Sequence, residues 1–223
     1  CTLSVFWRRN RWMEECSLRE TGVVDRETIE RYLCSTGQEK NRKKFKFHFV
    51  QMYGNDCGPA CCWMIIKWAN RLIINNDFSY IDFLQSIDGN IADGLWTVEL
   101  LKVLKSYDFR CIYCTTNISP STKQYEYLDF YKTTLINSDL VRVQKLFRTI
   151  SCESIHIFNA HVSIETIEDF LCYNANTVAL VLVDYSVLYP SKNCCTFKDF
   201  CGHYIVLIGY SRSRKAFKVV DPL

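Results

Sequence analysis

Glycine, proline and long apolar runs are scarce in this chain. Its 223 residues include only 8 glycines and 4 prolines, which excludes a collagen-like or linker-dominated architecture. The longest strongly apolar runs, 177–183 and 204–208, have the length of strands and fall far short of the ~18 residues that a membrane helix needs. A net charge of +3 is too small to indicate nucleic-acid binding. We therefore expect a globular protein with no membrane span and no nucleic-acid partner.

Cysteine, in contrast, is abundant. The 13 cysteines are odd in number and follow no regular spacing, and a chain of this size does not need disulfides to hold its core. The first eleven residues lack the layout of a signal peptide. These features favour a reducing compartment, the cytoplasm, with the nucleus as an alternative. Because the first residue is Cys1 rather than Met, the natural termini stay open, as does the oligomeric state.

The charge distribution divides the chain in two. Residues 1–46 carry more Lys and Arg than Asp and Glu, whereas the remainder is close to neutral. We predict a basic, partly flexible N-terminal segment over 1–46 and a compact domain over 47–223.

Hydrophobic periodicity predicts helices in the first half of that domain and strands in the second. Helical spacing of apolar residues occurs in five segments: 56–70, 79–87, 97–107, 139–150 and 163–173. Strand candidates occupy 110–115, 154–159, 178–183, 204–208 and 216–221. The runs at 178–183 and 204–208 are apolar without alternation, which is typical of central strands covered on both faces. The pattern is α+β, with an antiparallel C-terminal sheet.

One cluster of polar residues precedes the first of these helices. Cys57 falls in the first turn, after Asp56 as the expected N-cap. The unpaired N–H groups and the dipole of a helix N-terminus favour negative charge, and therefore the nucleophilic thiolate. Gln51, six residues earlier, can donate a hydrogen bond to an oxyanion that forms beside the sulfur. Gly58 is expected to let a substrate backbone approach.

A second cluster lies at the C-terminal end. His203 opens one apolar strand, and Asp221 ends the next. If the two strands form a hairpin about the polar turn 211–214, these side chains lie opposite each other on one face. The carboxylate then orients the imidazole, which serves as base to the thiol of Cys57. Nucleophile, base and orienting group follow in the chain order Cys, His, Asp.

These motifs resemble known families. Gln51, Cys57-Gly-Pro-Ala, Gly202-His203-Tyr-Ile-Val-Leu and Asp221-Pro222 resemble the papain-like fold, especially the bacteriocin-processing cysteine peptidases. Residues 47–223 resemble the guanylyl cyclase domain-containing protein family of animals and plants. The segments that carry this second resemblance include 56–61, 94–100, 130–132, 142–147 and 179–183. The papain-like motifs imply an α+β fold in which the Cys57 helix packs against the sheet of His203 and Asp221.

The resemblances imply different functions. The residues favour a thiol hydrolase or transferase that acts on a peptide or isopeptide-like carbonyl of a peptide or protein substrate, without a cofactor. The family name implies conversion of GTP to cyclic GMP with Mg²⁺ or Mn²⁺. Candidate carboxylates for that reaction exist at Asp88, Asp93 and Glu99, but nothing pairs them and no glycine-rich phosphate loop is present. A catalytically silent protein that binds a partner in the same cleft is a third reading.

Metal binding is a further alternative that the sequence leaves open. Cysteines that could form a thiolate zinc site stand on one strand candidate and before His203: Cys111, Cys114, Cys194, Cys195 and Cys201. Their spacing is poor for known zinc modules. We therefore predict no metal.

Overall fold

The computed structural model describes residues 2–7, 21–23, 45–69, 78–89, 91–116, 137–150, 154–173, 176–190 and 200–223. A seven-stranded mixed sheet runs through the molecule in the order β2-β4-β3-β1-β5-β6-β7. Its strands are β1 (Thr2–Trp7), β2 (Thr21–Val23), β3 (Arg110–Thr115), β4 (Ile155–His161), β5 (Thr177–Asp184), β6 (Gly202–Ser211) and β7 (Ala216–Val220). The expected α+β class is confirmed.

The direction of the strands agrees only in part with the prediction. β5, β6 and β7 are antiparallel neighbours, as expected, but β2, β4 and β3 run parallel to one another. β1 lies between β3 and β5 and pairs antiparallel with both. Two strands from the basic 1–46 segment thus belong to the same sheet as the rest, which the charge pattern did not predict. A separate domain boundary at residue 47 stays a prediction.

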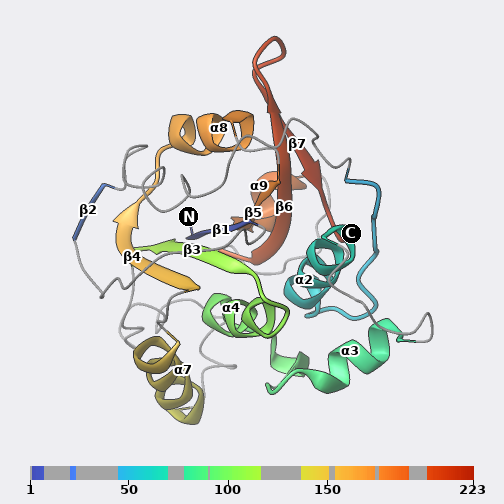
Figure 1. Cartoon of the computed structure of the whole chain (residues 1–223). Coiled ribbons are helices and arrows are strands. Elements are labelled where there is room, and N and C mark those ends of the chain that lie inside the picture. The colour runs from blue at the N-terminus through green and yellow to red at the C-terminus, as the bar shows by residue number, and fades with distance from the viewer. Residues whose placement is uncertain are drawn as a thin grey trace.

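Helices cover both faces of the sheet (Figure 1). On one face lie α2 (Cys57–Trp68), α3 (Tyr80–Ser86), α4 (Thr97–Ser106) and α7 (Asn137–Thr149), and on the other lies α8 (Ile164–Tyr173). The two short helices are η1 (Ile91–Asp93) and α9 (Tyr185–Leu188). Each of the five helices predicted from periodicity is present, with ends shifted by no more than two residues. No helix in the described part of the chain is long and apolar enough to cross a membrane.

Strand β5 shows why its sequence does not alternate. Val178 and Leu180 pack with the helices of one face, whereas Ala179 and Val181 pack with α8 on the other. Both sets are buried, so every position of the strand benefits from an apolar side chain. The prediction of central, doubly covered strands is confirmed for β5 and β6.

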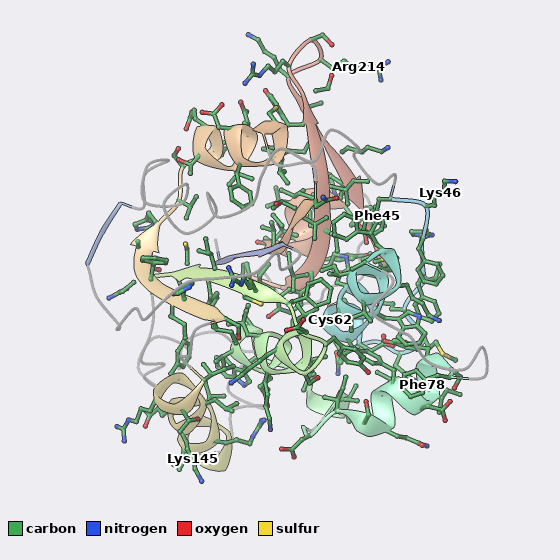
Figure 2. All side chains as sticks on the ribbon, in the orientation of Figure 1. Phe45, Lys46, Cys62, Phe78, Lys145 and Arg214 are labelled. Atoms are coloured by element: carbon green, nitrogen blue, oxygen red, sulfur yellow. The ribbon has the colours of Figure 1, made fainter. Side chains whose placement is uncertain are left out.

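Helix α2 is the most deeply buried helix, and an extended segment holds it from outside. Cys62 points into the interior beside α4, whereas Phe45 and Lys46 lie on the outer segment (Figure 2). Phe45 stacks on Trp68 and Phe49 packs against Tyr80. Because Phe45, Phe47 and Phe49 alternate with exposed residues, residues 45–51 form a strap whose apolar side covers α2. The strap fixes the loop that leads into Cys57.

The β6–β7 hairpin carries a register irregularity. Ser211 pairs with Ala216 and Gly209 with Lys218, but the next pairs are Leu207 with Val219 and Val206 with Val220. Ile208 is therefore an extra residue in β6, a β-bulge. This bulge determines to which face of the sheet each side chain at the end of β7 points.

Gly58 lies where α2 contacts α4 and β6. A Cβ at this position would lie 2.9 Å from Leu100 Cδ1 and 3.2 Å from Tyr204 Cδ2. The small residue therefore allows α2 to approach α4 and β6. The expectation that Gly58 makes room for a substrate backbone was wrong.

We predict that Gly58→Ala lowers the free energy of unfolding by about 1–3 kcal/mol, the usual cost of overpacking a core. Urea unfolding followed by circular dichroism measures this loss. Gly54→Ala is the matched control, because nothing lies within 4 Å of a Cβ there. Equal stability of the two variants would contradict this account of the α2 contact.

Candidate functional site

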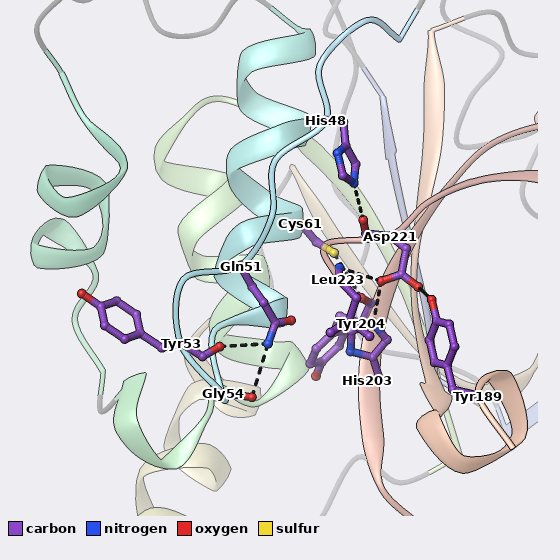
Figure 3. Close-up of polar contacts among 10 residues, drawn as sticks. All are labelled: His48, Gln51, Tyr53, Gly54, Cys61, Tyr189, His203, Tyr204, Asp221 and Leu223. Atoms are coloured by element: carbon purple, nitrogen blue, oxygen red, sulfur yellow. Dashed lines mark hydrogen bonds and ion pairs between the residues drawn. The ribbon is translucent and has the colours of Figure 1, made fainter. Parts of the chain in front are cut away.

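The predicted imidazole and carboxylate meet at the edge where β6 begins and β7 ends (Figure 3). His203 Nε2 lies 2.9 Å from Asp221 Oδ1. Only 5% of the His203 side chain and 21% of the Asp221 side chain are exposed, so the ion pair is largely shielded from water. The structure thus brings these two predicted residues together.

Their cross-strand relation differs from the expected one. Continuing the observed pairs by one residue places Asp221 opposite Ile205 rather than opposite His203. The displacement is two residues, and side chains two residues apart on a strand share a face. Without the Ile208 bulge, Asp221 would fall opposite Val206, and its side chain would point to the other face. The bulge therefore directs the carboxylate to the face of the imidazole.

Asp221 receives hydrogen bonds on both carboxylate oxygens. The Leu223 N–H donates to Oδ1 over 3.0 Å, and the Tyr189 hydroxyl donates to Oδ2 over 2.5 Å. Burial acts to raise the pKa of Asp221, but the hydrogen bonds from His203, Tyr189 and Leu223 outweigh it and hold the pKa below its usual value. Asp221 is therefore ionised at neutral pH and acts as an acceptor.

Cys57 begins α2 and is only partly buried. Its side chain lies close enough to the imidazole of His203 to influence the pKa of that ring. Since Nε2 of His203 faces Asp221, Nδ1 is the ring nitrogen left for the sulfur. Burial acts to lower the pKa of His203, but hydrogen bonds and charge attraction from Asp221 and Cys57 raise it to about 9. The imidazole is thus protonated at neutral pH and lies between a carboxylate and a thiol.

Asp56 organises the loop before Cys57 in an unexpected way. It occupies the N-cap position but makes no side-chain cap. Its fully buried carboxylate accepts hydrogen bonds from the N–H groups of Met52 and Tyr53 and from the Tyr80 hydroxyl. Asp56 therefore bends the 51–56 loop around itself rather than capping the helix as predicted.

Gln51 lies in that loop, but its amide nitrogen faces the loop itself. Gln51 Nε2 donates to the Tyr53 carbonyl over 2.8 Å and lies 3.5 Å from the Gly54 carbonyl. Its Oε1 is buried without a hydrogen-bond partner and points toward the strand of His203 and Tyr204 (Figure 3). Exchange of the two amide atoms would place oxygen against oxygen, so this orientation is the favourable one. To serve as an oxyanion donor, the amide would have to rotate.

Two further cysteines of α2 lie close to Cys57 but serve packing. Cys61 and Cys62 are fully buried and free, and burial raises the pKa of both thiols. The Cys61 thiol donates to the Tyr204 carbonyl over 3.3 Å. Both stay protonated, which leaves Cys57 as the accessible thiol of this helix.

The predicted metal alternatives find little support. Cys111 packs in the core on one face of the sheet and Cys114 on the other, so they cannot bind one ion together. Cys194 and Cys195 lie outside the described residues, and Cys201 is free and partly buried. Within the described ranges, no group of three His, Cys, Asp or Glu residues is arranged to hold a metal ion.

The carboxylates considered for a cyclase are largely occupied by cations. Asp88 pairs with Lys102 over 2.6 Å. Glu99 is buried, pairs with Arg142 and accepts a hydrogen bond from the Trp96 N–H.

Sequence reasoning missed two contributors to the site. The Tyr189 hydroxyl bonds Asp221, and His48 Nε2 donates to the Asp221 carbonyl over 2.6 Å. The Gln51 N–H donates to the Pro222 carbonyl over 2.6 Å. The alternation of Phe45, Phe47 and Phe49 could have shown that His48 faces away from α2. No comparable signal marks Tyr189.

Comparison with known proteins shows the family to which the chain belongs. Residues 47–223 match the family model described as guanylylate cyclase. Since this match covers most of the chain, the protein belongs to that family, and the predicted membership is confirmed. The chain is 31% identical over 188 residues to "Guanylyl cyclase 1" of Arabidopsis thaliana, over 78% of this chain and 63% of the relative. It thus spans less than two thirds of that relative's length. No solved structure matches the chain.

The raised pKa of His203 predicts a pH dependence of stability. A group whose pKa is higher in the folded than in the unfolded state stabilises the fold most when it is protonated in both. The contribution of His203 is therefore complete below pH 6.5 and is lost as the pH rises from 6.5 to about 9. We expect the free energy of unfolding to fall by up to about 3 kcal/mol across this window.

Denaturant unfolding at a series of pH values measures this fall. In Asp221→Asn, which removes the ionised partner, the fall should be much smaller. A wild-type stability that is constant between pH 6.5 and 9 would contradict the His203–Asp221 pair.

Proposed function

We propose that the protein is a thiol-dependent hydrolase or transferase that acts on a peptide or isopeptide-like carbonyl. The observation that carries the proposal is the position of the His203 imidazole, which lies 2.9 Å from Asp221 and close enough to Cys57 for the sulfur to raise the pKa of the ring. A thiol, a base and an orienting carboxylate in contact form the arrangement of nucleophilic catalysis. The position of Cys57 at the N-terminus of α2 further supports the proposal, because the dipole of a helix favours negative charge at that end.

In the first step, the Cys57 thiolate attacks the carbonyl carbon and forms a C–S bond. The protonated His203 then gives its proton to the leaving nitrogen as the C–N bond breaks, which leaves a thioester on Cys57. Asp221 holds the ring in place and stabilises its charge. N–H groups of the first turn of α2 supply hydrogen-bond donors for the oxyanion, and Gln51 adds one if its amide rotates away from Tyr53.

In the second step, water or an acceptor amine attacks the thioester. His203, now neutral, takes the proton of the attacking group, and the C–S bond breaks to return the thiolate. With water the product is a carboxylic acid, and with an amine it is a new amide. The residues alone do not distinguish hydrolysis from transfer.

The proposed fold is papain-like. The support comes from the chain order Cys, His, Asp and from a Cys57-bearing helix that packs against β6, the middle strand of the antiparallel set β5, β6 and β7. The parallel strands β2, β4 and β3 extend that core on the far side of β1.

We predict that iodoacetamide alkylates Cys57 at pH 6 at least about tenfold faster than Cys172 and Cys201, which are also free and partly buried. Peptide mapping by mass spectrometry gives the rate at each cysteine. His203→Gln should slow the reaction at Cys57 but not at Cys172. Equal rates at the three thiols in the wild type would count against a primed nucleophile and favour the catalytically silent binding protein.

Turnover is the direct test. Peptidyl and isopeptidyl aminocoumarin amides serve as probes, and Cys57→Ala is the control. Release of aminocoumarin by the wild type that persists in Cys57→Ala would refute the proposed nucleophile.

Guanylyl cyclase activity is a second candidate, supported by the family and by the name of the Arabidopsis relative. This reaction joins the ribose 3′-oxygen of GTP to its α-phosphorus and releases diphosphate. Divalent cations such as Mg²⁺ or Mn²⁺ supply charge neutralisation for it. Asp93 is the candidate carboxylate that remains from the sequence, because Asp88 and Glu99 are paired with Lys102 and Arg142.

For this second candidate, purified protein with GTP and Mn²⁺ or Mg²⁺ should form cyclic GMP, measured by mass spectrometry. Cys57→Ala should form it at the unmodified rate, because the thiol takes no part in the reaction. Asp93→Asn should lower the rate. The absence of cyclic GMP with either metal would remove this candidate for the present chain.

A further inference from the structure

Helix α9 is a single turn that follows β5, and it brings two tyrosines to the site. The Tyr185 ring meets the His203 ring edge-on, with centroids 5.5 Å apart and an interplanar angle of 90°. The Tyr189 ring lies 5.1 Å from the Tyr185 ring. Asp184 fixes the start of the turn by accepting hydrogen bonds from the backbone N–H and the hydroxyl of Ser186. The start of the turn is therefore both held by Asp184 and packed against the imidazole, and Tyr189 follows its other end.

The carboxylate of Asp221 needs outside support, because the residue lies just past the end of β7. Its backbone is held by His48, which donates to the Asp221 carbonyl, and by the Gln51 N–H, which donates to the next carbonyl. These contacts fix the main chain but not the plane of the carboxylate. The Leu223 N–H reaches Oδ1, the oxygen that His203 also contacts. Tyr189 provides the hydrogen bond at Oδ2.

We propose that Tyr189 is a positioning residue, which fixes the plane of the Asp221 carboxylate so that Oδ1 faces His203 Nε2. This inference rests on the proposed thiol function for its catalytic meaning. With Nε2 held in this way, the ring presents Nδ1 to Cys57. The hydroxyl of Tyr189 keeps its proton for this task, because its hydrogen bond to the ionised Asp221 raises the pKa of Tyr189 to about 12.

The test uses Tyr189→Phe, which keeps the ring against Tyr185 and removes only the hydroxyl. The titration of His203 is followed by NMR of its ring C–H signals, which is practical because the chain has four histidines. We expect the midpoint of the His203 titration to fall by about 0.5–1 pH unit. Without the Tyr189 hydroxyl, the Asp221 carboxylate is held less firmly against the ring and stabilises the protonated imidazole less. Alkylation of Cys57 by iodoacetamide at pH 8.5 should slow by up to about threefold, because a midpoint lowered from about 9 leaves fewer rings protonated beside the sulfur at that pH.

Two comparisons separate positioning from general disturbance. Tyr53→Phe removes the hydroxyl of an exposed tyrosine and should leave the titration of His203 unchanged. Asp221→Asn should give a larger shift than Tyr189→Phe, and adding Tyr189→Phe to Asp221→Asn should give no further shift, because Tyr189 acts through Asp221. Thermal unfolding verifies that each variant is folded.

A His203 midpoint in Tyr189→Phe equal to that of the wild type would overturn the inference, as would an added shift in the double variant. The titration of His203 needs no turnover and no reactive thiol. If Cys57 in the wild type reacts no faster than Cys172, the proposed function fails while the role of Tyr189 in holding the pair is still tested. If Cys57 is selectively reactive and Tyr189→Phe changes nothing, only the inference fails.

Discussion

The hydrogen bond between His203 and Asp221 is the interaction on which the rest of the site depends. It exists because β6 contains one residue more than β7 over the paired stretch, and this extra residue, Ile208, returns Asp221 to the face of His203. A side-chain period of two leaves no intermediate position: the carboxylate either faces the imidazole or points to the opposite side of the sheet. A local backbone irregularity thereby decides whether the imidazole beside Cys57 has a carboxylate partner.

Much of the architecture follows from residue patterns. The apolar faces of the helices and the unbroken apolar runs of β5 and β6 are local signals, because burial on one or both faces leaves a direct trace in the sequence. The pairing of His203 with Asp221 could be anticipated from a hairpin about its polar turn, since an error of two residues preserves the face. An error of one residue would have placed the two side chains on opposite faces of the sheet.

Other features depend on contacts between segments that are distant in sequence. β1 lies in the middle of the sheet although it belongs to a segment rich in charge, because hydrogen bonding to β3 and β5 outweighs the weak local pattern. Asp56 is a good N-cap by residue type, yet the buried hydroxyl of Tyr80 and two loop N–H groups offer its carboxylate more bonds than the helix does. Gln51 turns its amide toward Tyr53 for a similar reason. Propensity describes each residue alone, and these outcomes are set by competition among partners.

The strap over α2 has a consequence for the order in which the segments around Cys57 are synthesised and dock. His48 and the Asp221 carbonyl that it contacts are 173 residues apart, so the two segments that border the thiol are synthesised far apart in time. Closing so long a loop is slow compared with forming local helices. Helix α2 finds the strand on which it packs, and Cys57 finds the imidazole of His203, only when β6 docks, and the strap can close over α2 only after residue 221 has been made.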